Sequence, residues 1–321
     1  MTFPVKDVRI ANKTYPVAGL SNSDLYFGAI TDDFEPDFHA FCRRFIQDDY
    51  VCVDIGANIG MKSLMLSQYA QYGRVIAVEA SPEVGQVLAL NVERSGERNI
   101  SVCHCAVSDN DGQVGFAGNS AYGHISQDGE KVPAKRLSTV LAEHGLTRCD
   151  FIKIDVEGYE YPILRDSLAT INEHGSLVLF EFNSWCQIAH ADVAPLAFAR
   201  WIVENFSHVY MIRRSGTAMG ELQRVPPDGA LTLLHTNMVD DTCLSDILVT
   251  NAPERLSPTL AHLQRQEAEM SARCDALTAR LAAVESELDK VRHERDALLS
   301  STSWRLSAPL RAVGRMIKGR D

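Results

Sequence analysis

Acidic side chains follow several apolar runs in this sequence. The densest group follows Phe151–Ile154, where Asp155, Glu157 and Glu160 fall within six residues. A carboxylate beside a hydroxyl can accept its proton, and a cluster of like charges raises the pKa of at least one member. The group therefore offers general-base chemistry. A structural role for Asp155 or Glu160 stays open, because acids also favour the first turn of a helix.

A glycine turn follows another apolar run, VCVDIGANIG at residues 51–60. Asp54 ends the run, and Gly56, Asn58 and Gly60 lead into a helical pattern. Glycine lets the backbone approach a ligand closely, and a helix N-terminus offers free N–H groups. The spacing differs from the Gly-x-Gly-x-x-Gly of dinucleotide binders. An acid before the first glycine suits a ligand with a cationic amino group.

Two further acids end the next two apolar runs. Glu79 stands 25 residues after Asp54, where its carboxylate can accept both hydroxyls of a ribose. Asp109 follows Ala106–Ser108 and is placed to accept an adenine amino group. Each alone is weak, since such an acid is often only a helix cap. Their order along three successive strand ends indicates a nucleotide-like cofactor.

A metal site is an alternative interpretation of the acids. Asp155, Glu157, Glu181 and Asn183 carry the oxygen ligands that Mg²⁺ prefers. Nothing in the sequence fixes a coordination geometry, so we predict no metal. His124 is the next candidate base if the carboxylates prove structural.

Strands that alternate with helices must position these residues. Seven strands are predicted at Tyr50–Ile55, Arg74–Glu79, Ile100–Val107, Phe151–Asp155, Ser176–Phe182, Val209–Arg213 and Asp246–Thr250. Helical patterns occupy most of the intervening segments. This order predicts an α/β fold with a mostly parallel seven-stranded sheet. An N-terminal segment (1–50), with a hairpin at Val8–Val17 and a helix at Pro36–Ile46, precedes the catalytic domain (51–252). Ser215–Leu231 is predicted as a loop.

The stretches IKIDVEGYE, DIGANIG and VLFEFN resemble the FkbM-type methyltransferase family, over about residues 35–185. The resemblance implies a Rossmann-like class I fold and S-adenosyl-L-methionine as the cofactor. It also implies methyl transfer to a hydroxyl oxygen, often of a sugar or a polyketide. By matching position, Asp54, Gly56, Asn58 and Gly60 would hold the methionine part, Glu79 the ribose and Asp109 the adenine. Asp155, Glu157 and Glu160 would line the acceptor side.

Composition narrows the class of protein. A net charge of −11 argues against nucleic-acid binding, which normally uses a basic face. The eight cysteines form no Cys-x-x-Cys pair, so no zinc ribbon is expected. The first residues have no apolar signal core, and no run reaches 18 apolar residues. We expect a cytoplasmic protein with reduced thiols.

A heptad repeat occupies residues 259–299. Apolar residues recur at spacings of three and four, and Arg280 with Glu285 and Glu287 with Arg292 flank them. This predicts a parallel homodimeric coiled coil, with a single amphipathic helix as the alternative. Residues 300–321 form a basic tail that resembles tails of bacterial enzymes of surface-polysaccharide assembly. The tail suits either an anionic membrane surface at the inner face of the membrane or a protein partner, or is simply solvated.

Together these features predict an O-methyltransferase that acts on a glycan or glycolipid hydroxyl in bacterial surface-polysaccharide synthesis. A non-catalytic scaffold of a polysaccharide-assembly complex is one alternative. A nucleotide-linked Rossmann oxidoreductase is the other. Tight NAD binding would favour the oxidoreductase, and cofactor binding without turnover would favour the scaffold.

Overall fold

The computed structural model describes residues 3–31, 33–118, 122–126, 128–212, 220–257, 260–302 and 304, with side chains of the last helix from Cys274 onward. The chain divides into two compact units, Met1–Pro258 and Thr259–Asp321. Within the described ranges, no helix has both the length and the apolar character to cross a membrane.

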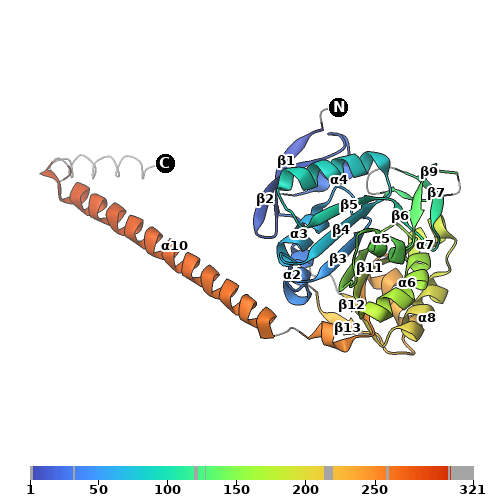
Figure 1. Cartoon of the computed structure of the whole chain (residues 1–321). Helices are drawn as coiled ribbons and strands as arrows, with labels where there is room; N and C mark the ends of the chain where they lie inside the picture. Colours follow the sequence, from blue (N-terminus) through green and yellow to red (C-terminus); the bar gives the residue numbers. More distant parts are fainter. Residues whose placement is uncertain are drawn as a thin grey trace, which may run out of the picture. The chain divides into compact units, whose positions relative to one another are not determined.

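An eight-stranded sheet forms the centre of the first unit (Figure 1). Its order is β13-β12-β14-β11-β10-β3-β4-β5. The strands are β3 (Val51–Ile55), β4 (Arg74–Glu79), β5 (Ile100–His104), β10 (Phe151–Ile154), β11 (Leu177–Asn183), β12 (His208–Ile212), β13 (Leu222–Arg224) and β14 (Leu244–Thr250). The run from β5 to β11 is parallel, whereas β14 is antiparallel to both β11 and β12. The predicted α/β fold is confirmed, and each of the seven predicted strands contributes to this sheet. The third, predicted at Ile100–Val107, is correct only as far as His104, because Ala106–Val107 forms a separate strand in another sheet.

The eighth strand is a correction to the predicted count. β13 lies in the segment predicted as a loop and pairs antiparallel with β12. It has only three residues and none is buried, so it lacks the apolar pattern of the other strands. Arg213, the last residue of the predicted sixth strand, lies outside the described residues.

Helices cover both faces of the sheet because each buried strand sends alternate side chains to opposite sides. In β11, Leu177 and Leu179 join one apolar cluster, and Val178 and Phe180 join the other. The first cluster includes α2 (Pro36–Phe45), α3 (Met61–Tyr69) and α4 (Pro82–Ser95). The second includes α5 (Leu137–Glu143), α6 (Glu160–His174), α8 (Pro195–Asn205) and α9 (Ala230–His235). Shorter elements are α7 (Ser184–Ala191), the π-helical turn η2 (Thr236–Asp240) and the 3₁₀ turn η3 (Pro253–Leu256).

The N-terminal segment packs into the first of these cores. β1 (Val5–Ile10) and β2 (Lys13–Ala18) form an antiparallel hairpin, as predicted, and α1 (Leu25–Ala29) follows. Buried Asn91 fastens the hairpin to α4. Its side chain accepts the N–H of Ala18 at 2.7 Å and donates to the carbonyl oxygens of Ala18 and Ile59 at 3.0 and 2.8 Å. The segment is therefore part of the domain that carries the site.

A small second sheet was not predicted. It contains β6 (Ala106–Val107), β7 (Gly112–Ala117), β8 (His124–Ile125) and β9 (Glu130–Lys135), in the order β6-β9-β7-β8. β9 contains Pro133, which removes one N–H from the ladder and weakens the sequence pattern of a strand. This sheet supplies one wall of the cavity described below.

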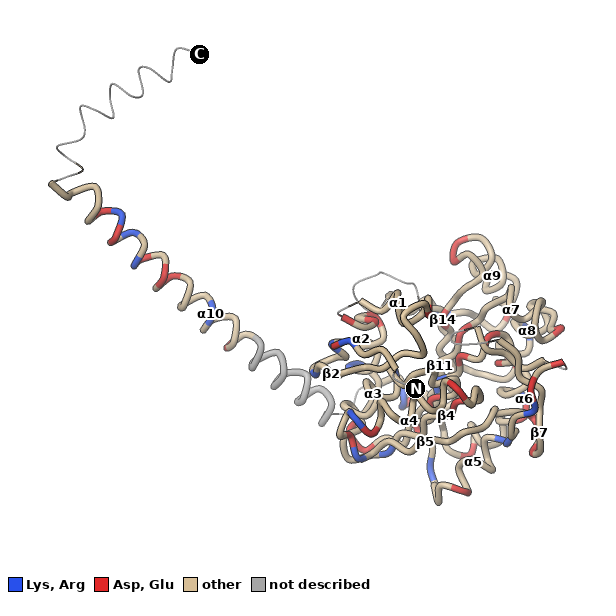
Figure 2. The backbone as a smooth tube through the Cα atoms, turned by 90° about the horizontal axis from the view of Figure 1, so that it is seen from above, with Lys and Arg blue, Asp and Glu red and all other residues tan. Residues whose placement is uncertain are grey.

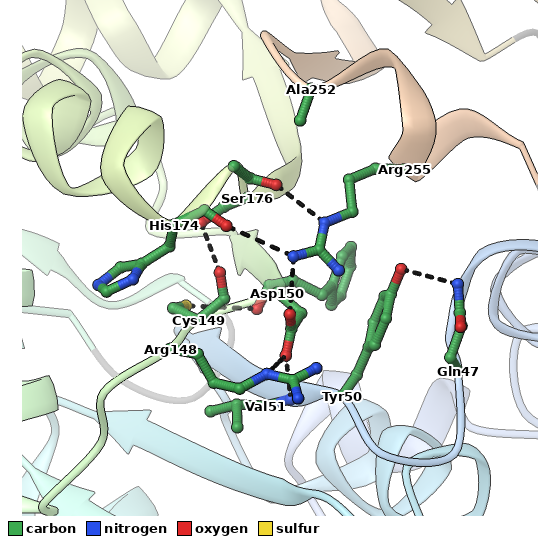
Figure 3. Close-up of polar contacts among 12 residues, drawn as sticks. Gln47, Tyr50, Val51, Arg148, Cys149, Asp150, His174, Ser176, Ala252 and Arg255 are labelled. Atoms are coloured by element: carbon green, nitrogen blue, oxygen red, sulfur yellow. Dashed lines mark hydrogen bonds and ion pairs between the residues drawn. The ribbon is translucent and has the colours of Figure 1, made fainter.

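The buried carboxylate of Asp150 holds together the N-terminal ends of β3 and β10 (Figure 3). Asp150 accepts the N–H of Val51, Nε of Arg148 and Nη2 of Arg255, each at 2.8 Å. Arg255, in η3, also donates to the carbonyl oxygen of Gly175 at 3.0 Å. The turn that ends the first unit is thus tied to the start of the central strands.

In the second unit the described structure is α10 (Leu260–Ser300), a helix of 41 residues. It confirms the predicted helix; the pairing of two chains stays a prediction. Opposite charges alternate along the part whose side chains are described (Figure 2). The predicted basic tail lies outside the described residues beyond Trp304.

Candidate active site

A cavity of about 470 Å³ lies at the carboxyl ends of β3, β4, β10 and β11. Open α/β sheets bind their ligands at this edge. Of the predicted site residues, Gly56, Asn58, Glu79, Asp155 and Glu157 line the cavity. The other four, Asp54, Gly60, Asp109 and Glu160, do not line it.

The glycine turn needs backbone conformations that side chains disfavour. Gly56, Asn58 and Gly60 have φ values of 78°, 51° and 96°. A Cβ on Gly56 would lie 1.9 Å from the carbonyl oxygen of Asp155, so only glycine lets the ends of β3 and β10 approach this closely. The turn thereby brings the predicted cofactor side against the predicted acceptor side.

Glu79 is held in a fixed orientation at the end of β4. Its Oε2 accepts the N–H of Asn58 at 2.9 Å, and its Oε1 accepts the N–H of Ser81 at 2.8 Å. The side chain is buried, and burial raises the pKa of its carboxyl although these N–H groups oppose the shift. A carboxylate oxygen can accept two hydrogen bonds, and Glu79 lines the cavity, so the carboxylate can accept hydrogen bonds from a pair of neighbouring hydroxyl groups.

Asn58 carries an unused acceptor in the cavity wall. Its Oδ1 is buried and has no hydrogen-bond partner among the residues that the structure describes. Such an atom costs free energy unless a ligand or water pairs with it. The turn thus combines an orphaned acceptor with an oriented carboxylate, which fits a ligand that has an amino group and a ribose.

Asp54 lies behind the turn rather than on the cavity surface. It is fully buried, accepts the hydroxyl of Ser63 at 2.6 Å and lies 3.9 Å from Nζ of Lys153. Gly60 begins α3 without lining the cavity. Both residues therefore belong to the turn but have no surface in the cavity.

Asp109 also lies off the cavity wall. Its carboxylate lies 3.5 Å from the hydroxyl of Tyr159, 3.0 Å from the amide nitrogen of Asn110 and 3.9 Å from Nη2 of Arg165. The wall beside it consists of Cys105, Ala106 and Val107 instead. These contacts connect the end of β6 to α6.

Two lysines hold Asp155 as an anion. Nζ of Lys153 lies 2.8 Å from its Oδ2, and Nζ of Lys62 lies 3.5 Å from the same atom. Burial opposes the charged form, but the two ammonium groups outweigh it and lower the pKa of Asp155. A carboxylate stabilised in this way is a weak base.

Glu157 and Glu181 complete an acidic cluster with Asp155. One carboxylate oxygen from each of the three lies within 4.8 Å of the others. Burial, followed by repulsion from Asp155 and Glu157, raises the pKa of Glu181 to about 9. Burial also raises the pKa of Glu157, whose Oε2 accepts the thiol of Cys186 at 3.2 Å. The cluster therefore combines Asp155, whose pKa is lowered, with Glu157 and Glu181, whose pKa values are raised.

Asn183, which the metal interpretation included, has another use. Its Oδ1 accepts the N–H of Cys186 at 3.0 Å and caps the first turn of α7. The three carboxylates remain suited to a hard cation, but the fourth expected ligand is already engaged.

The buried side chain of Glu160 binds the backbone of the loop that follows β10. It is fully buried, and its Oε1 accepts the N–H groups of Val156 and Gly158 at 3.0 and 3.3 Å. Burial raises its pKa to about 7. Through these two hydrogen bonds Glu160 stabilises the turn in which Glu157 adopts a φ of 54°.

His124 reaches the cluster indirectly. Its ring stacks on that of His190 with centroids 3.9 Å apart and an interplanar angle of 10°. Nδ1 of His190 in turn lies 3.0 Å from the backbone oxygen of Glu157. His124 itself does not line the cavity, although its neighbours Gly123 and Ile125 do.

The N-terminal segment contributes cavity residues that the sequence did not reveal. Glu35, Asp37 and Phe38 line the wall, and Glu35 lies 3.2 Å from Nζ of Lys62. No motif connects residue 35 to the site, because only the fold brings the two together. Lys153 carried a signal, since a lysine within a buried strand needs a partner.

Comparison with known proteins agrees with this geometry. Residues 54–194 match the methyltransferase FkbM domain. The chain contains an FkbM-type methyltransferase domain. This family uses S-adenosyl-L-methionine, so the turn at Gly56–Asn58 and Glu79 is the candidate site for that cofactor.

Two curated relatives and one solved structure show the extent of the similarity. Methyltransferase sdnD from Sordaria araneosa is 29% identical over 208 residues, which cover 51% of this chain and 74% of that protein. Methyltransferase 1 from Beauveria bassiana (strain ARSEF 2860) is 26% identical over 158 residues, 41% of this chain and 62% of that one. The crystal structure of methyltransferase FkbM from Methylobacillus flagellatus KT is 16% identical with a TM-score of 0.41, covering 64% of this chain and 44% of that chain.

Proposed function

We propose that this FkbM-type methyltransferase transfers the methyl group of S-adenosyl-L-methionine to a hydroxyl oxygen of a glycan or glycolipid. The observation that carries the proposal is the placement of Glu157 in the cavity wall beside the cofactor turn. When bound, the cofactor supplies an electrophilic methyl group on a sulfonium. The chain must then align the acceptor oxygen and take up its proton.

Glu157 is the proton acceptor in this proposal. Asp155 is too well stabilised as an anion by Lys153 and Lys62, and Glu181 holds its own proton at neutral pH. Glu160 does not line the cavity. Glu157 lines it, and burial brings its pKa closer to neutrality, which is where a general base works best.

The remaining groups position rather than react. The Lys153–Asp155 pair fixes the end of β10. The close approach of Gly56 to the backbone of Asp155 keeps that strand end against the cofactor turn. Holding two reacting atoms in line and in contact supplies several kcal/mol of the barrier lowering. Displacement at a methyl group requires mainly this alignment.

The charge of the cavity supports a neutral or basic acceptor. Among the described lining residues are seven acidic side chains, one of which is the protonated Glu181, and two ammonium groups, both of which pair with Asp155. Such a wall repels phosphate and carboxylate groups, whereas carboxylates readily accept hydrogen bonds from sugar hydroxyls. Phe38 and Phe116 add apolar surface against which the carbon face of a sugar can pack.

The test is methyl transfer from cofactor with a deuterated methyl group to a panel of neutral, amino and acidic glycans. We expect neutral or amino glycans to gain the label and acidic ones to remain unlabelled. Glu157→Gln should lower kcat by at least about 100-fold with unchanged cofactor affinity, the usual scale for loss of a general base. Glu143→Gln, at an exposed position of α5, is the matched control.

Two outcomes would overturn the proposal. A Glu157→Gln variant with the wild-type rate would exclude Glu157 as the base. Tight cofactor binding without transfer to any glycan would favour the scaffold alternative instead. Comparing the methylation of surface glycans from cells with and without the protein then identifies the acceptor in its natural setting.

A chelator separates this mechanism from a metal-assisted one. With a carboxylate base, activity should persist in EDTA. Loss of activity in EDTA and recovery with Mg²⁺ would instead assign Asp155, Glu157 and Glu181 as ligands, because their oxygens lie close enough to share an ion.

A further inference from the structure

The described part of α10 carries two rows of apolar side chains along one side. Leu277, Val284, Val291 and Leu298 form one row at intervals of seven, and Leu281 and Leu288 belong to the other. These six side chains are 47% to 65% exposed in the single chain. A continuous apolar seam of this kind on an otherwise charged helix is stable when other helices cover it.

The charges beside the seam are complementary to a second copy of the same helix. The two rows correspond to heptad positions d (Leu277, Val284, Val291, Leu298) and a (Leu281, Leu288). Arg280 and Glu287 then occupy position g, and Glu285 and Arg292 occupy position e five residues later. In a parallel, in-register assembly, position g of one chain faces position e of its neighbour, so each pairing is between opposite charges. Within one chain Arg292 only reaches Asp289, at 3.3 Å in an exposed pair that is worth little.

We propose that α10 assembles with other copies of this chain into a parallel bundle of more than two helices. The residue types at positions a and d determine how many helices pack together. Two-stranded coiled coils favour β-branched residues at a and leucine at d, because side chains meet the partner at different angles in the two positions. The opposite arrangement favours three or four strands.

The opposite arrangement is present in two successive heptads of α10, between Leu277 and Leu298 at d. Leucines 281 and 288 occupy a, whereas valines 284 and 291 occupy d, in the middle of the described helix. The predicted parallel homodimer rests on the heptad spacing and the flanking charges, which indicate association but do not fix the number of chains. The distribution of leucine and valine supplies that count.

Arg295 is the polar side chain in row a at the end of the seam. It is 63% exposed in its side chain and lies 2.6 Å from Asp296, so its long stem can lie along the seam while its charge stays at the surface. Glu267 is a second polar residue at a position of row a, outside the part of α10 whose side chains are described. Polar residues at a restrict the register of the chains at some cost in stability, and they therefore favour an in-register parallel bundle.

The test uses the full chain and an exchange variant. Leu281→Val, Leu288→Val, Val284→Leu and Val291→Leu together leave the composition unchanged but place valine at a and leucine at d. Sedimentation equilibrium should give the wild type a mass of three or four times the 35.5 kDa of one chain. The exchange variant should fall to two chains with the same helix content by circular dichroism.

A second variant shows that the contact lies on α10. Leu281→Asp with Val284→Asp should reduce the mass to one chain without changing cofactor affinity, since neither residue belongs to the first unit. A wild-type mass of one or two chains would overturn the proposal. So would an exchange variant that keeps the wild-type mass, or an aspartate variant that remains assembled.

Discussion

The ammonium group of Lys153 lies 2.8 Å from the carboxylate of Asp155 at the end of β10. Lys153 is only 5% exposed, so the ion pair is what allows a charged side chain inside the central sheet. Asp54, at 3.9 Å, is a second and more distant partner. The pair thus connects the stability of the domain to the shape of its acidic cluster.

Asp155→Asn should destabilise the domain because it leaves Lys153 with the distant partner alone. Breaking a buried ion pair by removing one partner costs about 3–5 kcal/mol, and we expect the lower end because Asp54 remains. Adding Lys153→Met should recover much of the loss by removing the orphaned charge. Urea unfolding followed by circular dichroism measures both. A double variant no more stable than Asp155→Asn alone would contradict this account.

Glu79→Ala should weaken binding of S-adenosyl-L-methionine. Losing hydrogen bonds to a charged group costs about 1–3 kcal/mol, or about 5- to 150-fold in Kd. Calorimetry on the purified protein measures the affinity. Glu97→Ala is the matched control, because Glu97 also accepts two hydrogen bonds, from Lys13 and Tyr15, but does not line the cavity. Equal affinities in the two variants would count against Glu79 as a cofactor residue.

Glu181→Gln should make the cofactor-free domain less sensitive to pH. Glutamate in the unfolded chain ionises near pH 4.3, whereas Glu181 in the folded domain ionises at about 9. Between these values the folded state binds more protons, so wild-type stability falls as the pH rises. The variant cannot ionise, and its advantage in unfolding temperature should grow from about pH 5 to about pH 9. Each kcal/mol corresponds to about 2–4 °C for a domain of this size.

Differential scanning calorimetry across that window provides the measurement. Glu143→Gln serves as the control, since Glu143 is an exposed acid on α5. If Glu181→Gln differs from the wild type by the same amount at every pH, the raised pKa of Glu181 is refuted.

Arg255→Met should destabilise the first unit although residue 255 lies beyond the predicted end of the catalytic domain at residue 252. Arg255 pairs with a carboxylate whose side chain is 2% exposed, at 2.8 Å. Losing this bond should cost about 1.5–3 kcal/mol, the scale for hydrogen bonds to charged groups. Arg148→Met, whose side chain is 46% exposed, should cost less.

The same contact predicts where the chain can be shortened. A chain ending at Ser257 should keep the stability of the first unit, whereas one ending at Asn251 should lose at least as much as Arg255→Met. Guanidinium unfolding of the two truncated chains makes the comparison. Equal midpoints would show that η3 contributes nothing to the fold.

The seven main strands were predictable because each is a short run of buried aliphatic residues between turn signals. The second sheet was not, since β7 and β9 contain glycine and proline and are only partly buried. Gly56 and Glu79 could be predicted as site residues because each stands at the end of a recognisable strand, Gly56 within the glycine turn after β3 and Glu79 as the last residue of β4. Glu35 and Lys62 were not, because an ion pair across 27 residues depends on how α2 packs against α3. Glu181 appeared only in the metal alternative, although a charge within a buried strand is itself a sign of a site.

The position of β14 has a consequence for synthesis on the ribosome. β14 is the last strand of the sheet to be made, yet it lies between β11 and β12. Until Leu244–Thr250 leaves the exit tunnel, β12 and β13 have no place in the sheet, and β11 presents an unpaired apolar edge. Such an edge is a template for aggregation. A nascent chain stalled after about residue 240 should therefore depend on chaperones, and the arrival of one seven-residue strand should release it.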